Sequence, residues 1–239
     1  MKLVVISPEH DDPRETAVLG ALFAAGLERY HVRKPHWSAG RLAVWLRALP
    51  RAWYPRLVLH QHHELVAEFG LGGCHWRDDV NVGRDRPPSP RLCSAGPIPP
   101  RIRKSAGFGD PALQRGVFTS RSCHGLVTLK AALGRYDSVF FGPVFPSISK
   151  PGHGPRTDFM PEELTALLGQ RTAAERKTAV LALGGVTAKN LPRCRDLGFD
   201  GAAVLGAVWQ APDPVAVFRN LQAVGAKACC APMDAMVQP

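Results

Sequence analysis

The chain has no uninterrupted apolar run long enough to cross a bilayer, and its mean hydropathy is -0.09. Its first residues, MKLVVISPEHDD, contain only a very short apolar segment, and acidic residues follow it. This pattern predicts a first β-strand rather than a signal peptide. We therefore expect a soluble, cytoplasmic protein with no membrane partner.

The six cysteines contain no C-x-x-C pair, so the usual redox and zinc spacings are missing. Cys74, Cys123 and Cys194 fall inside apolar patterns, which predicts that they are buried packing residues. The adjacent Cys229 and Cys230 stand in a tail without periodicity, and we interpret them as incidental. In a cytosolic chain all of these are expected to be reduced thiols.

Acidic residues are few: 20 Asp and Glu stand against 30 Lys and Arg, which gives a net charge of +10. Such a balance suits nucleic acid or small anionic substrates as partners. Aromatic residues are not interleaved with basic ones, and zinc-finger spacings and heptads are absent. We therefore expect a small anionic ligand and no nucleic-acid partner.

Strand-like apolar runs alternate with amphipathic helical patterns along the 239 residues. The predicted strands are 2–7, 30–33, 56–60, 73–76, 117–123, 138–141, 179–183 and 202–205. The predicted helices are 15–25, 39–49, 64–69, 126–133, 161–168, 189–197 and 214–224. Eight strands with helical crossovers predict an α/β protein with a single (β/α)8 TIM barrel. A doubly wound open sheet is the alternative, but no G-x-G-x-x-G follows the first strand.

The expected domain is one barrel over residues 1–226, followed by an unstructured tail at 227–239. A Pro-rich basic insertion at about 82–115 interrupts it where a helix should stand between the fourth and fifth strands. The insertion is expected to be a solvated loop or, alternatively, a basic flap over an anionic substrate.

Anion-binding features follow the sixth, seventh and eighth predicted strands. Residues 140–152, FFGPVFPSISKPG, carry Ser147, Ser149 and Lys150 on a loop shaped by glycine and proline. Gly184-Gly185 and Leu205-Gly206 end the next two strands, and glycine lets backbone N–H groups approach a ligand. In a barrel these strand ends meet at one rim, which predicts a phosphate pocket.

Histidines gather at the other strand ends. His124 is the candidate general acid–base residue, and Ser122, two residues earlier, would share its face. His60 and His62 would point the same way on a strand and, with His75 and His124, could hold a transition metal. The alternative is that each is a hydrogen-bonded wall residue.

These segments together resemble the thiamine phosphate synthase/TenI family, in the family's order. The matching segments are 31–35 (HVRKP), 57–76, 120–125 (SRSCHG), 140–152, 182–190 (ALGGVTAKN) and 201–209 (GAAVLGAVW). The resemblance implies a thiamine-biosynthesis enzyme that acts on a small phosphorylated thiazole. It implies either a synthase, which couples an aminopyrimidine diphosphate to thiazole phosphate with Mg²⁺, or a TenI-type tautomerase without a metal.

The sequence departs from the synthase pattern at the expected magnesium ligands. His60 and Gln61 stand where the family usually has an Asn-Asp pair, and only Asp78 or Asp79 lies near the second acidic position. Imidazole suits Mg²⁺ poorly. The sequence therefore favours a TenI-like thiazole tautomerase without a cofactor. The alternatives are the synthase itself, with Mg²⁺ on Asp78 or Asp79, and a non-catalytic barrel that binds a phosphorylated ligand.

In the favoured interpretation His124 moves the proton, and Arg33 or Lys34 pairs with the substrate carboxylate. The expected substrate- and phosphate-binding residues are Ser147, Ser149, Lys150, Gly184, Gly185, Leu205, Gly206, Ser122, His60 and Gln61.

Overall fold

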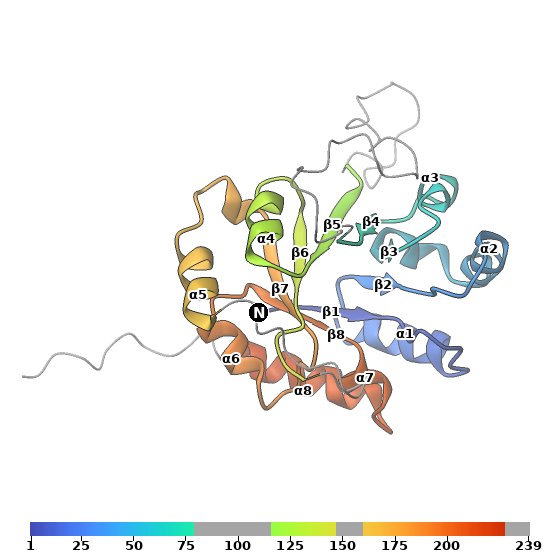
Figure 1. The fold of residues 1–239 in the computed structure, drawn as a ribbon. Helices are drawn as coiled ribbons and strands as arrows, with labels where there is room; N and C mark the ends of the chain where they lie inside the picture. Colours follow the sequence, from blue (N-terminus) through green and yellow to red (C-terminus); the bar gives the residue numbers. More distant parts are fainter. Residues whose placement is uncertain (79–115, 147–159, 228–239) are drawn as a thin grey trace, which may run out of the picture.

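The computed structural model describes residues 1–78, 116–146 and 160–227. Eight parallel strands close into a barrel in the order β1 to β8, and β8 pairs with β1 (Figure 1). The prediction of a TIM barrel is confirmed, and the open sheet is excluded. The strands are β1 (Lys2–Ile6), β2 (Tyr30–Val32), β3 (Leu57–Leu59), β4 (Gly73–Trp76), β5 (Phe118–Cys123), β6 (Ser138–Phe141), β7 (Ala179–Leu183) and β8 (Gly201–Val204).

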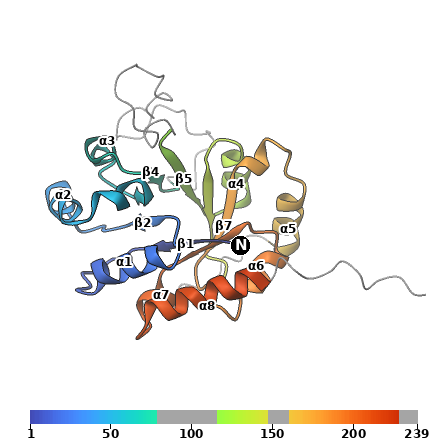
Figure 2. The same cartoon turned by 180° about the vertical axis from the view of Figure 1, so that it is seen from behind.

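Helices surround these strands (Figures 1 and 2). They are α1 (Glu15–Ala24), α2 (Ala39–Ala48), α3 (Glu64–Phe69), α4 (Leu126–Ala132), α5 (Pro161–Gly169), α6 (Leu191–Asp196), α7 (Gly206–Trp209) and α8 (Pro214–Lys227). Two 3₁₀ turns, η1 (Arg51–Arg56) and η3 (Glu175–Lys177), precede β3 and β7. The two 3₁₀ turns and α7 were not predicted, because pieces this short carry no periodicity. The insertion at 82–115 and residues 228–239 of the tail lie outside the described residues.

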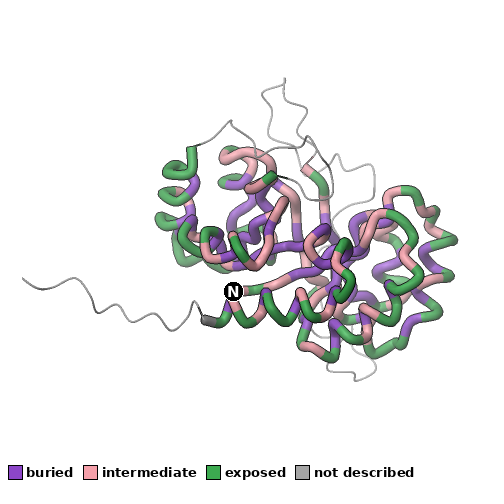
Figure 3. Tube along the Cα trace, turned by 90° about the horizontal axis from the view of Figure 1, so that it is seen from below, coloured by how far each residue is buried: buried purple, intermediate pink, exposed green. Residues whose placement is uncertain are grey.

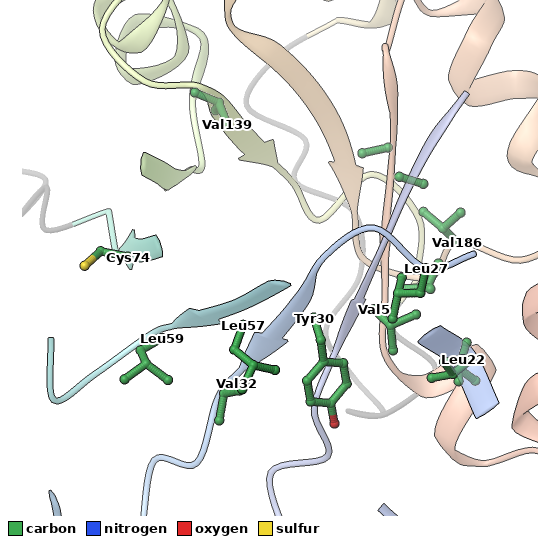
Figure 4. Close-up of a cluster of buried hydrophobic side chains, with 14 of the residues drawn as sticks. Val5, Leu22, Leu27, Tyr30, Val32, Leu57, Leu59, Cys74, Val139 and Val186 are labelled. Atoms are coloured by element: carbon green, nitrogen blue, oxygen red, sulfur yellow. The ribbon is translucent and has the colours of Figure 1, made fainter. Parts of the chain in front are cut away.

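The main hydrophobic core lies between the barrel and its helices. Successive strand residues alternate between the two faces of a sheet, so Val5, Tyr30, Val32 and Leu57 point outward toward the helices (Figure 4). Their strands read as nearly continuous apolar runs because both faces of a parallel barrel are buried. Figure 3 shows the same arrangement, with buried strands inside a shell of helices whose outer faces are exposed.

The predicted packing role of three cysteines is confirmed, since Cys74, Cys123 and Cys194 are all buried free thiols. Burial raises the pKa of Cys123 and of Cys194 to about 12, so neither is a thiolate near neutral pH. None of the helices in the described ranges combines the length and apolar character of a membrane span.

The barrel interior is divided by polarity. On the side of β1 and β6 to β8 it holds an apolar cluster that includes Val4, Ile6, Phe140 and Leu181. On the side of β2 to β5 the buried interior residues are mostly polar, with His31, His60, His75 and Ser120 beside the apolar Val58. This division places titratable groups against one wall, directly below the carboxyl ends of the strands.

Candidate active site

A cavity of about 430 Å³ opens at the carboxyl ends of the strands, and all eight strands or the loops that follow them contribute to its lining. This is the end at which TIM-barrel enzymes carry their active sites. Two basic residues, Arg33 after β2 and Arg77 after β4, line the cavity together with glycines and apolar residues that follow β7 and β8. Since β4 lies opposite β8 in the closed order, Arg77 and the glycines lie on opposite sides of the cavity, whereas Arg33 lies between them on the β1 side.

Most of the predicted site residues in the described part of the chain meet at this cavity. Those lining it are Arg33, His60, Asp78, Ser122, His124, Gly184, Gly185, Leu205 and Gly206. Ser147, Ser149, Lys150 and Asp79 lie outside the described residues, so their roles remain predictions. The lining also includes Glu9 and Arg77, which the sequence shows only as charged residues after strands.

The glycine side is shaped by backbone conformation. Gly184 and Gly185 have φ values of 92° and 63°, in the left-handed region that favours glycine. A Cβ on Gly185 would lie 2.2 Å from the carbonyl oxygen of Pro146, and a Cβ on Gly184 would lie 2.7 Å from Cβ of Pro143. Only glycine therefore lets the turn after β7 pack against the loop after β6, the loop in which a phosphate ligand was predicted.

Arg33 is held in the cavity by the loop after β1. Its guanidinium forms an ion pair with Glu9, whose side chain is 21% exposed. The Arg33 backbone N–H donates to Oγ of Ser7 at 2.7 Å, and that hydroxyl donates to the Arg33 carbonyl oxygen at 3.0 Å. The end of β2 is thereby fixed to the end of β1, with one cation directed into the cavity.

Lys34, predicted to pair with a substrate carboxylate, is not part of the cavity lining. Its ammonium lies 2.5 Å from Oε2 of Glu15, and both side chains are almost fully buried. It also donates to the carbonyl oxygens of Pro8 at 2.8 Å and His10 at 3.4 Å. Burial raises the pKa of Glu15 above its usual value, while the neighbouring Lys34 acts in the opposite direction. Lys34 therefore joins α1 to the loop that carries Glu9.

His124 lines the cavity and has a defined tautomer. Its Nδ1 lies 2.6 Å from the carbonyl oxygen of Gly142, which can only accept, so Nδ1 carries the proton. In the neutral ring Nε2 is then the nitrogen able to take a proton. The His124 backbone N–H donates to Oδ2 of Asp78 at 2.9 Å. This arrangement gives the ring a fixed orientation suited to proton transfer.

Asp78, one of the two possible magnesium ligands, already accepts hydrogen bonds from other groups of the protein. Its Oδ1 lies 3.2 Å from the Arg121 guanidinium, and its Oδ2 accepts from the Thr128 hydroxyl at 3.1 Å as well as from His124. The Asp78 side chain is only 4% exposed. It therefore holds the turn between β5 and α4, although the residue also contributes to the cavity lining.

The residues of the described part of the chain do not fit Mg²⁺. This ion needs oxygen ligands in near-octahedral geometry, with one or two carboxylates available. The carboxylate of Asp78 is bonded as above, and that of Glu9 is paired with Arg33. Gln61 offers one buried amide oxygen without a hydrogen-bond partner in the described residues, while its amide nitrogen donates to the Lys34 carbonyl oxygen. We derive no catalytic step through a magnesium ion.

The predicted grouping of histidines is only partly correct. β3 ends at Leu59, so His60 and His62 do not share a strand face, and His62 bonds to the Trp37 carbonyl oxygen at 2.8 Å instead. His124 is turned toward Gly142. The three imidazoles that come together are those of His31, His60 and His75.

A closed parallel barrel with a cavity at the carboxyl ends of its strands, lined by apolar residues, glycines and a few charged and histidine side chains, is the arrangement of a TIM-barrel enzyme. A family model described as thiamine monophosphate synthase matches residues 111–208. The chain is 30% identical to a protein named thiamine-phosphate synthase from Bordetella bronchiseptica, over 90% of both chains. It is also 30% identical to one from Chromobacterium violaceum, over 92% of this chain and 93% of the relative. The chain belongs to the thiamine-phosphate synthase family and is an enzyme of thiamine biosynthesis.

A solved structure supports the same assignment. The crystal structure of thiamine phosphate pyrophosphorylase from Bacteroides thetaiotaomicron is 26% identical, with a TM-score of 0.65. The match covers 95% of this chain and 98% of that one. The names of these relatives support the coupling enzyme better than the tautomerase that the sequence favoured.

Proposed function

We propose that this chain is a thiamine-phosphate synthase, which couples an aminopyrimidine diphosphate to a thiazole phosphate. The observation that carries this proposal is the 30% identity to thiamine-phosphate synthases over 90% or more of their length. The barrel cavity is consistent with it, because it offers two separate places for anionic groups.

In the proposed reaction the lone pair of the thiazole ring nitrogen forms a bond to the methylene carbon of the pyrimidine. The bond from that carbon to the diphosphate oxygen breaks, and pyrophosphate leaves with the electron pair. The ring nitrogen becomes a quaternary cation, and no proton has to be removed from the thiazole. The demands on the protein are therefore orientation and stabilisation of the leaving diphosphate.

The two sides of the cavity suit these two demands. The backbone at Gly184, Gly185 and Gly206 would receive the thiazole phosphate, since glycine permits close approach to the N–H groups. Arg77 on the opposite side, together with Arg33 after β2, would neutralise the diphosphate, because planar guanidinium groups match phosphate oxygens. Because Glu9 pairs with Arg33, Arg77 is the one of these two cations that has no acidic partner among the described residues.

A thiazole tautomerase is the second candidate, and the tautomer of His124 is the observation that favours it. A tautomerase needs a base that takes a proton from one ring position and returns it to another. Nε2 of the neutral His124 ring could do this without a metal. The occupied carboxylates of Glu9 and Asp78 are also easier to reconcile with a reaction that does not use Mg²⁺.

The experiment supplies the full chain with the pyrimidine diphosphate, the thiazole phosphate and Mg²⁺, and measures pyrophosphate over many turnovers. Sustained release that requires both substrates supports the synthase. No release, together with proton exchange on the thiazole carboxylate phosphate, would overturn it in favour of the tautomerase. Saturable thiazole phosphate binding without either reaction would instead indicate a non-catalytic binding barrel.

A further inference from the structure

Three histidines occupy the interior wall of the barrel below the cavity. His31 on β2, His60 after β3 and His75 on β4 are all buried, with exposed fractions of 0%, 8% and 1%. One nitrogen from each ring lies within 4.8 Å of the corresponding nitrogens of the other two. The opposite interior wall is apolar, so these rings form a distinct polar cluster rather than part of a general polar core.

Hydrogen bonds within the protein do not satisfy this cluster completely. Nδ1 of His31 lies 3.1 Å from Nε2 of His60, so one of the two donates to the other. His75 contacts the hydroxyls of Ser120 and Ser122, each at 2.9 Å. Nε2 of His31 is buried and has no partner among the residues described. A buried polar atom without a partner is costly, but the His31 nitrogen at ligand spacing from His60 is Nδ1, so Nδ1 and not this atom is the candidate metal ligand of His31.

Burial inside the barrel favours the neutral form of each ring, which is the form that binds metal ions. It lowers the pKa of His31 to about 3 and holds the pKa values of His60 and His75 well below the usual range.

We propose that His31, His60 and His75 form a binding site for a divalent transition metal of the zinc class. The chemistry of the donors selects this class, because neutral imidazole suits Zn²⁺ and related ions and suits Mg²⁺ poorly. Three protein ligands leave a fourth coordination position. His60 and His75 border the cavity, so that position faces the space where substrate would lie. The site is independent of the synthase proposal.

The three imidazole rings need only a local adjustment to bind a metal ion together. Zn–N bonds of about 2.0–2.1 Å in a tetrahedral site place the ligand nitrogens about 3.3 Å apart. His31 and His60 already meet this spacing at 3.1 Å. His75 stacks on His60 with ring centroids 4.0 Å apart, so its ring has to tilt toward the other two. One serine contact of His75 would be released and the other would orient the ring, as is usual around metal-bound histidine.

The test titrates Co²⁺, a spectroscopic substitute for Zn²⁺, into the full chain freed of metals. The expected result is one equivalent of Co²⁺ with the visible absorption bands of a four-coordinate site, and displacement of that Co²⁺ by Zn²⁺. His75→Asn should weaken binding by more than about 100-fold, and Ser120→Ala by about 10- to 100-fold. Circular dichroism establishes that each variant is folded.

His62→Asn is the matched control, because His62 belongs to the same HQHH run but contacts Trp37 instead of the cluster. It should bind Co²⁺ as the wild type does. Three results would overturn the proposal: wild-type protein without four-coordinate bands, bands that persist in folded His75→Asn, or bands lost equally in His62→Asn. Persistent bands would indicate that other ligands, such as the tail cysteines, hold the ion. Pyrophosphate release is not used as a readout, so failure here leaves the proposed function unaffected.

Discussion

Nδ1 of His124 donates to the carbonyl oxygen of Gly142 across 2.6 Å, from the end of β5 to the end of β6. The contact fixes which nitrogen of the ring can act as a base, and it separates the two candidate reactions. Coupling requires no base on the thiazole, whereas tautomerisation does.

His124→Asn tests this distinction, because the Asn amide can still donate to Gly142 while the basic nitrogen is lost. If the chain is a synthase, the rate of pyrophosphate release stays within about threefold of wild type, since general acid–base catalysis worth about 10²–10⁴ is not involved. Steady-state assays of wild type and variant measure this. A drop of 100-fold or more in a folded variant would show that coupling depends on the His124 ring, and would contradict a mechanism without a base.

Lys34 is predicted to matter for stability through its buried ion pair with Glu15. Lys34→Met leaves the Glu15 carboxylate buried and unpaired, which should lower the free energy of unfolding by about 3–5 kcal/mol. Replacing Glu15 by Gln as well should recover much of the loss. Lys130→Met is the control, because the Lys130 side chain of the Lys130–Glu175 pair is 58% exposed and its loss should change stability by less than about 1 kcal/mol. Similar urea midpoints for Lys34→Met and Lys130→Met would show that the buried pair contributes no more to stability than the Lys130–Glu175 pair.

Alanine substitutions at two glycines, Gly185 in the turn after β7 and Gly40 in α2, should change stability in opposite directions. Gly185→Ala combines a left-handed φ with a contact that needs the backbone to move, so it should destabilise by about 1–3 kcal/mol and raise KM for the thiazole phosphate. Gly40→Ala, in α2 with open space around it, should stabilise by about 0.5 kcal/mol and leave KM unchanged. Thermal unfolding and substrate titration measure both effects. An unchanged KM for folded Gly185→Ala would show that this turn does not take part in binding the phosphate.

Glu175 should contribute stability that depends on pH. The Thr172 backbone N–H, Lys130 and the Thr172 hydroxyl lower its pKa to about 2, from an ordinary value of 4.5. Because the pKa is lower in the folded state, Glu175 makes its full contribution to the free energy of unfolding above pH 4.5. That contribution is lost as the pH falls toward 2. Glu175→Gln should therefore be less stable than wild type at pH 7, with a smaller difference at pH 3. Urea unfolding of wild type and variant at pH 7 and at pH 3 measures the difference, and an equal difference at the two pH values would contradict the lowered pKa.

The sequence predicted the order of all eight strands because most of them are short apolar runs between turn residues and helical patterns separate them. Each predicted strand end differs from the observed one by no more than one residue. What periodicity cannot show is which neighbour a polar side chain meets. Arg33 and Lys34 are adjacent in the chain, yet one lines the cavity and the other is buried beside Glu15.

The histidines illustrate the same difficulty. The spacing of His60 and His62 predicts that they act as a pair, but β3 ends before them, and His60 instead groups with His31 and His75 from the neighbouring strands. Likewise Asp78 was named as an acidic residue, whereas its donors, Arg121 and Thr128, come from more than 40 residues later in the chain. Contacts between strands depend on closure of the barrel, which no local pattern encodes.

The most direct test of the proposed function measures both products in one reaction of the wild-type chain with the two half-substrates. Thiamine phosphate is quantified by chromatography and pyrophosphate by an enzymatic assay at the same time points. We predict that the two products appear in equal amounts and that neither forms when one substrate is omitted. Pyrophosphate without thiamine phosphate, or neither product from an enzyme that still exchanges protons on the thiazole, would contradict the assignment as a synthase.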